Sequence, residues 1–247
     1  MLEPEAATRT TGDPHAPLLY AMRAMLADFM AHEQTEAGGV INRTLGYVLA
    51  YPVLLRCVPD YPLRREVESY IDRLKQDLRA HPEGMENSAN YLPITMMFLV
   101  RWIDENQPEL WKDPRVRHGF ENILQMLTSS GELPMFGDYG GTLQRNFLMV
   151  AALERLASVY HDGRFKWAAQ AMARRCIDTL DLAKVNSWDT QALAFAIAWT
   201  DDTITPQLPT DGSVLLKRVE GHLDKLVLRT GWGPDDRQVM FDLLRSE

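Results

Sequence analysis

Apolar residues recur at helical spacing through about the first 200 residues of the chain, separated by short polar breaks. The segment 61–81 is highly charged with a narrow apolar stripe, which is typical of a helix with one face in water. The segment 91–105 is apolar nearly all round, which predicts a buried helix. The full pattern predicts helices over residues 16–34, 43–58, 61–81, 91–105, 113–130, 142–162, 163–183 and 187–202.

The helical segments alternate loosely between more polar and more apolar. This alternation is expected when hairpins of outer and inner helices curl round a common centre, so we predict a toroid-like or solenoid-like arrangement. No repeat of fixed period is visible, which argues against a regular TPR or HEAT array.

The pattern changes after the stretch TPQLPTDG. Residues 213–221, 225–231 and 237–247 are short, rich in β-branched residues and separated by Gly, Pro and Asp, which predicts strands. Two or three strands alone cannot close a sheet and leave unpaired edges. We therefore expect the 247 residues to be a piece of a longer protein, and we expect this piece to end just inside a β domain.

Composition and charge narrow the classes of function. The chain is 46% hydrophobic, enough for a real core, and its net charge is −8, from 26 basic and 34 acidic residues. No long run of like charge is present, so we predict no nucleic-acid partner, and any anionic ligand must meet a local basic site. Cys57 and Cys176 have no CxxC or His-rich neighbourhood, so we predict buried thiols and no metal or cofactor.

The N-terminal residues MLEPEAATRTTGDPHAP lack the basic-then-apolar order of a signal peptide. No segment reaches the roughly 18 apolar residues that a membrane span requires, so no membrane association is expected. The oligomeric state is not readable from the sequence.

The stretch EGMENSANY places polar residues at the start of the most apolar helix. Glu86, Asn87, Ser88, Asn90 and Tyr91 lie where exposed N–H groups and the helix dipole favour negative charge. A tyrosine in this position would have its phenolate stabilised. The structural alternative is that Ser88 or Asn90 caps the helix and Tyr91 packs at its end.

The stretch GELPMFGDYGGTLQRNF predicts a glycine-rich loop with Asp138 and Tyr139, followed by a helix capped by Thr142. Gln144 and Arg145 would lie in the first turn of that helix. Glycine lets backbone approach a ligand closely, so such loops often line sites. An ordinary turn is the equal alternative.

The stretch INRT opens another helix. Asn42 as a helix cap and Arg43 as a solvated charge are sufficient explanations. Together they could also hold a carboxylate, Arg43 through charge-assisted hydrogen bonds and Asn42 through its amide.

In their order along the chain, the three stretches resemble the heparinase II/III-like polysaccharide lyases, which cleave alginate, heparin and related uronate polymers. NRT stands where those proteins often have an Asn-His pair, EGMENSANY resembles their Glu-x-Ser-x-x-Tyr stretch, and LPMFGDYGG resembles their Pro…Gly-Asp loop. DKLVLRTGWGPDDRQVMFDL looks like the beginning of their β-sandwich. The resemblance covers most of residues 38–247.

The resemblance implies a mainly α fold: an incomplete (α/α) toroid of helical hairpins, followed by the first strands of a truncated antiparallel β-sandwich. The expected boundaries are a disordered or linker N-terminus over 1–15, a catalytic toroid over 16–205 and the sandwich from 206 to 247. The parent protein would be periplasmic or extracellular, and its partner an anionic polysaccharide.

By the same resemblance, Asn42 neutralises the substrate carboxylate and Tyr91 is the catalytic phenol, while Arg43 stands in the place of the family's His. Arg stays protonated, so this departure leaves charge neutralisation intact but puts proton transfer by this residue in doubt. A further base supplied by the sandwich would lie beyond Glu247. We expect the remaining contacts to the polysaccharide from Glu86, Asn87, Ser88, Asp138, Tyr139 and Arg145.

The chemistry accounts for this set of residues. A lyase removes the proton at C5 of a uronic acid and expels the oxygen at C4, so the neighbouring carboxylate has to be neutralised. The aromatic side chains of Tyr139, Trp102 and Trp188 are candidates for stacking on sugar rings, although a Trp on an apolar helix more often belongs to the core. The alternatives are a glycoside hydrolase that uses Glu86 and Asp138, and a non-catalytic module that binds glycan or protein.

Overall fold

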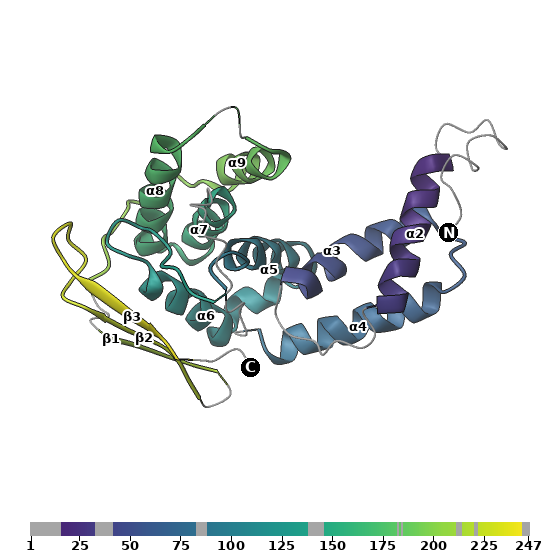
Figure 1. Cartoon of the computed structure of the whole chain (residues 1–247), viewed down its shortest axis with the longest axis horizontal. Coiled ribbons are helices and arrows are strands. Elements are labelled where there is room, and N and C mark those ends of the chain that lie inside the picture. The colour runs from purple at the N-terminus through teal and green to yellow at the C-terminus, as the bar shows by residue number, and fades with distance from the viewer. Residues whose placement is uncertain are drawn as a thin grey trace. The chain divides into compact units, whose positions relative to one another are not determined.

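A computed structural model describes residues 16–32, 42–82, 88–137, 146–181, 183, 185–210, 214–219 and 222–243 (Figure 1). Over these residues the protein is mainly helical, with a small antiparallel sheet near the C-terminus, which confirms the predicted class. Each of the predicted helices and strands is present. The chain forms two compact units, residues 1–81 and 82–247, and the predicted domain boundaries near 15 and 205 stay predictions.

The first unit contains α2 (Ala16–His32), α3 (Asn42–Cys57) and α4 (Arg64–Ala80). As predicted, α4 is amphipathic, because its apolar residues return every three or four positions to one face. This face is buried and α4 packs on α3, whose Leu45, Val48 and Leu55 are buried in turn. The buried residues of α4 are Val67, Tyr70, Ile71, Leu74 and Leu78.

The second unit contains five α-helices and one short 3-10 helix among its described residues. They are α5 (Leu92–Asn106), η2 (Pro108–Lys112), α6 (Pro114–Met126), α7 (Phe147–Tyr160), α8 (Gly163–Asp178) and α9 (Ser187–Trp199).

Helix α7 is the centre of the second unit and packs against α5, α8 and α9 (Figure 1). Its Ala151 and Ala152 are fully buried, as are Ala168 and Ala169 of α8, so small side chains let these helices approach closely. Helix α5 is buried on nearly all sides, as its sequence predicts.

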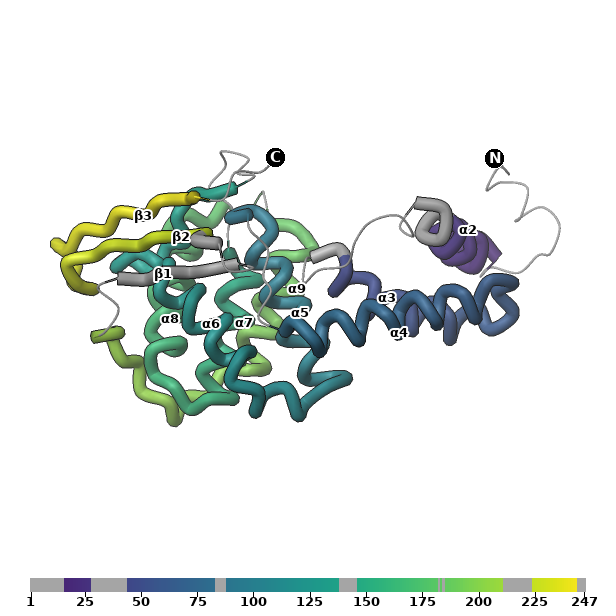
Figure 2. Tube along the Cα trace, turned by 90° about the horizontal axis from the view of Figure 1, so that it is seen from below, coloured from purple at the N-terminus to yellow at the C-terminus, as the bar shows by residue number. Residues whose placement is uncertain are grey.

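The sheet consists of β1 (Val214–Val219), β2 (His222–Arg229) and β3 (Gln238–Asp242), hydrogen-bonded in that order and antiparallel. Figure 2 shows β2 and β3 side by side. Lys225, Val227 and Arg229 form the buried face of β2. On the opposite face Leu228 pairs with Val239, and Leu226 with Phe241; of these, Leu228, Val239 and Phe241 are exposed. Strands β2 and β3 therefore carry charged side chains on their inner face and apolar side chains on their outer face.

Two side chains of the inner face fasten the sheet to the C-terminal end of α6. Arg229 donates to the carbonyls of Gln125 and Leu127, and Gln238 donates to the carbonyl of Met126 at 2.9 Å. These carbonyls lack partners within the helix, and the helix dipole favours a cation there. Burial lowers the pKa of Arg229 to about 10.

Candidate functional site

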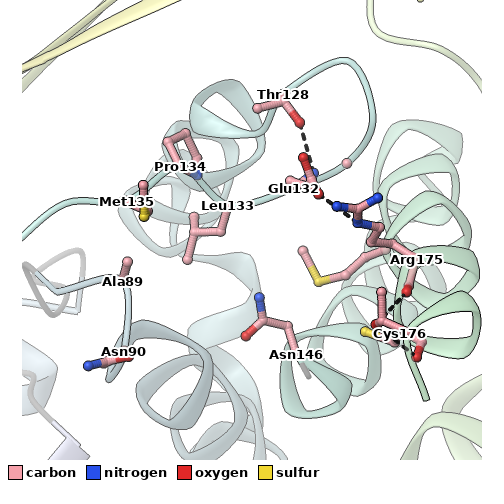
Figure 3. Close-up of a pocket in the computed structure, with 13 residues that line it drawn as sticks. Ala89, Asn90, Thr128, Glu132, Leu133, Pro134, Met135, Asn146, Arg175 and Cys176 are labelled. Carbon is pink, nitrogen blue, oxygen red and sulfur yellow. Dashed lines mark hydrogen bonds and ion pairs between the residues drawn. The ribbon is translucent and has the colours of Figure 1, made fainter. Parts of the chain in front are cut away.

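A cavity of about 300 Å³ lies within the second unit (Figure 3). Its walls come from the residues before α5, the loop between α6 and α7, the residue directly before α7, and the C-terminal half of α8 with the residue that follows it. Leu133, Pro134, Met135 and Met172 supply apolar surface. The polar groups come from Asn90, Thr128, Glu132, Asn146, Arg175 and Thr179.

The loop that forms one wall begins with a tight turn. The N–H of Gly131 donates to the carbonyl of Thr128 at 2.9 Å, and the N–H of Glu132 donates to the Thr128 hydroxyl at 3.0 Å. Gly131 has a φ of +77°, a conformation that favours glycine. A Cβ at this position would lie 2.6 Å from the Cβ of Ala171. Glycine therefore allows the loop to lie directly against α8.

The far end of the same loop is held by two other parts of the unit. The N–H of Ala89 donates to the carbonyl of Phe136 at 3.0 Å, and the N–H of Gly137 donates to Asp242 of β3 at 3.2 Å. Two of the stretches singled out in the sequence, around Asn90 and from Gly131 onward, thus lie side by side and line one cavity.

The sheet supports this end of the loop through a buried ion cluster. The Lys225 ammonium lies 2.6 Å from a carboxylate oxygen of Asp224 and 2.7 Å from one of Asp242. It also lies 5.0 Å from the centre of the Phe136 ring. Lys225 and Asp224 are fully buried, so each depends on the other for compensation of its charge.

An ion pair between Glu132 of the loop and Arg175 of α8 forms part of the cavity wall. Nε of Arg175 lies 2.7 Å from Oε1 of Glu132, and the two side chains are 52% and 36% exposed (Figure 3). The Ser130 hydroxyl donates to the second oxygen of Glu132 at 3.2 Å. Glu132 is thus held from both sides, and more than half of the Arg175 side chain stays exposed.

Two amide side chains border the same space. Asn146 is the N-cap residue of α7, but its side chain makes no capping hydrogen bond. Figure 3 shows its amide extending from the start of α7 toward the loop that carries Glu132. The Oδ1 atom of Asn90 is buried and has no partner in the described part of the chain. Among the described residues, the Asn146 side chain thus caps no helix N–H, and the Asn90 oxygen accepts no hydrogen bond.

Tyr91 is the N-cap residue of α5 and is 40% exposed. It directly follows Asn90 but is not one of the cavity-lining residues. Its helix has no side-chain cap, so the structural alternative in which Ser88 or Asn90 caps it is wrong. The buried Ser88 hydroxyl instead accepts from the N–H of Asn90 at 3.3 Å, which closes a turn just before the helix.

The other predicted site residues are distributed differently. Asn42 and Arg43 begin α3 in the first unit, whereas Tyr91 belongs to the second, so a site shared by the three stays a prediction. Others lie outside the described residues, namely Glu86, Asn87, Asp138, Tyr139, Thr142, Gln144 and Arg145. The helix that Thr142 was expected to cap begins at Phe147.

The tryptophans and cysteines divide between core and surface. Trp102 is fully buried and belongs to the core, whereas Trp188 is 47% exposed, with its ring centre 6.0 Å from that of Phe98. Cys176 is buried, as predicted, and lines the cavity. The same prediction is wrong for Cys57, which is exposed near the end of α3.

Sequence reasoning missed the two charged residues of the cavity and one of its amides. Glu132 and Asn146 lie within the stretch that was singled out, but they were not distinguished from its other polar residues. Arg175 follows another arginine in the charged last turn of α8, where a solvated surface charge is the ordinary interpretation. That turn contains no glycine or aromatic residue that would indicate a ligand. Only the fold therefore reveals Arg175.

The site and fold together define a mainly helical protein with a small antiparallel sheet and one described polar cavity. The chain matches no family model, no curated protein and no solved structure. In the described part of the chain, none of the helices has the length and apolar character needed to cross a bilayer.

Proposed function

We propose that the protein is a polysaccharide lyase, or the helical part of one, that cleaves a uronic-acid polymer by β-elimination. In this proposal Asn42 and Arg43 neutralise the carboxylate of the sugar that is cleaved, and Tyr91 transfers the proton. The observation that carries the proposal is the cavity beside Tyr91, which is lined by residues from two of the three stretches that resemble the lyases.

The cavity has the polar groups that a sugar requires. Amides, a carboxylate and a guanidinium lie around an opening whose remaining surface is aliphatic. Such mixed surfaces hydrogen-bond hydroxyl groups while covering the apolar edges of a ring. Tyr91 is partly exposed at the helix start and directly follows Asn90, which lines the cavity. In this proposal the substrate extends from the cavity to Tyr91.

The reaction needs a phenol and a neutralised carboxylate. Removal of the C5 proton places a second negative charge on a group that is already an anion, and each preorganised donor is typically worth about 3–4 kcal/mol in such a case. A tyrosine can accept this proton as phenolate and then protonate the leaving oxygen at C4.

The architecture that belongs to this proposal is an incomplete toroid with one layer of a β-sandwich. The packing of α7 against both α8 and α9 supports successive antiparallel hairpins. The exposed side chains Leu228, Val239 and Phe241 on the outer face of the sheet support a second layer, since a sandwich buries such a face.

The experiment is a panel of uronate polymers, each incubated with the protein and monitored for an ultraviolet-absorbing product. Elimination creates a C4–C5 double bond that absorbs, and hydrolysis does not. We expect Tyr91→Phe to lower turnover by about 10²- to 10⁴-fold, because it removes the group that transfers the proton.

Tyr160→Phe is the matched control. It removes an equivalent hydroxyl in the same unit, and that hydroxyl is buried without a hydrogen-bond partner in the described residues. Turnover should be unchanged in this variant. Saturated oligosaccharide products would contradict the lyase and favour the hydrolase. Equal effects of the two substitutions would contradict the role of Tyr91.

A further inference from the structure

Arg175 is held so that one edge of its guanidinium remains available. Nε of Arg175 lies 2.7 Å from a carboxylate oxygen of Glu132, and the Arg175 side chain is 52% exposed and lines the cavity. A guanidinium presents its N–H groups as a rigid planar fork that matches a carboxylate. Fixing Nε therefore orients the remaining donors and lowers the entropy lost when an anion binds.

The other polar groups around the cavity can hydrogen-bond a ligand with hydroxyl groups. The Asn146 amide both donates and accepts, and makes no hydrogen bond to its own helix. Glu132 is an acceptor with lone pairs beyond those used by Arg175 and Ser130. A simple anion would satisfy Arg175 but leave these groups unused, so the set fits a molecule with both a carboxylate and hydroxyls.

The volume limits the size of this molecule. A cavity of about 300 Å³ is at the lower end of the range for ligand pockets, roughly 300–1,000 Å³. It has room for one sugar ring rather than several. Leu133, Pro134 and Met172 offer aliphatic surface to the ring itself.

We propose that the cavity is a subsite for a single acidic sugar unit, in which Arg175 binds the carboxylate and Asn146 and Glu132 bind ring hydroxyls. The ligand class rests on the proposed lyase function, and the subsite holds a unit next to the one that is cleaved. Arg175 is a binding residue here, distinct from Asn42 and Arg43 at the reacting carboxylate.

The test measures the binding of monosaccharides, without turnover, to the full chain. Binding is monitored by ligand-observed NMR titration. The probes are the monosaccharides glucuronate, galacturonate, mannuronate and guluronate. The matched control ligands are glucose, which lacks the carboxylate, and acetate, which lacks the sugar ring. At least one uronate should bind about tenfold or more tightly than either control ligand, because one charge-assisted hydrogen-bonded pair is worth this much.

Arg175→Ala should weaken binding of that uronate by about tenfold or more, and Arg175→Lys should weaken it less because the charge is kept. Arg174→Ala is the matched control, since Arg174 is exposed, lies on the same helix and does not line the cavity. Its uronate affinity should equal that of the wild type. Loss of an exposed ion pair costs only about 0–1 kcal/mol, so the thermal unfolding midpoint of Arg175→Ala should stay close to wild type.

Equal loss in the Arg174 and Arg175 variants, equal binding of acetate and uronate, or no uronate binding at all would overturn the subsite. The outcome for the lyase is separate. Uronate binding that depends on Arg175, without any unsaturated product from polymers, keeps the subsite and refutes the lyase. Unsaturated product formed with an unchanged KM in Arg175→Ala keeps the lyase and refutes the subsite.

Discussion

Gly131→Ala tests the close contact between the cavity loop and α8. Gly131 has a φ of +77°, and a Cβ there would lie 2.6 Å from Cβ of Ala171 and 3.1 Å from the backbone nitrogen of Met172. The added methyl group therefore meets both a strained backbone conformation and atoms of the α8 backbone and of Ala171.

The expected cost follows from these two contributions. A left-handed conformation costs an L-residue roughly 1–2 kcal/mol, and overpacking of a tight contact typically costs about 1–3 kcal/mol. The reduced entropy of the unfolded chain returns about 0.4–1 kcal/mol. We expect Gly131→Ala to lower the free energy of unfolding by about 2–4 kcal/mol.

The assay is urea unfolding of four proteins: the wild type, Gly131→Ala, Ala171→Gly and the double variant. Ala171→Gly alone should cost about 1 kcal/mol, as glycine does inside a helix. In the double variant the Cβ–Cβ overlap is absent, so its cost should be smaller than the sum of the single costs by about 1 kcal/mol or more. Additive costs, or a Gly131→Ala variant as stable as wild type, would refute this contact.

Two further predictions concern buried charge. Burial raises the pKa of Asp162, but hydrogen bonds from Arg164 and the charges of Arg164 and Arg117 lower it by more. The pKa of Asp162 is therefore below its usual range. The stability this provides is present above pH ~4 and is lost as the pH falls below that value. Asp162→Asn should therefore cost roughly 1–3 kcal/mol at pH 7 and flatten the acid side of a stability-against-pH curve measured in urea; an unchanged curve would contradict the shift. Lys225→Met leaves the buried Asp224 without its cation and should cost about 3–5 kcal/mol in urea unfolding at pH 7, and a loss under about 1 kcal/mol, typical of an exposed pair, would contradict the buried cluster.

Much of the secondary structure was predictable because it depends on local pattern. The stripe of α4 and the nearly uniform apolarity of α5 each indicate a helix and the side that is buried. The strands were recognisable from β-branched residues between turn residues. Helix starts were less predictable. The N-caps Tyr91 and Asn146 make no side-chain capping bond, so no capping signal marks where these helices begin.

The candidate site was predictable only in part. The sequence pointed to the stretches that contain Asn90 and Glu132, because polar and glycine-rich segments before helices often line sites. It did not indicate that these stretches share a cavity, nor that Arg175 completes it. Arg175 is 43 positions from Glu132 along the chain, as the residue numbers show, and no periodicity relates residues so far apart.

The amino-acid sequence by itself determined which segments are helices and strands, which faces are apolar, and where the polar breaks fall, because these properties depend on neighbours within a few residues. Tertiary structure alone decided that the loop after α6 lies on α8, that Arg175 faces Glu132, and that Lys225 is buried between two aspartates. These pairings depend on how whole elements pack, and packing is set by the combined shape and burial of many side chains rather than by any single stretch.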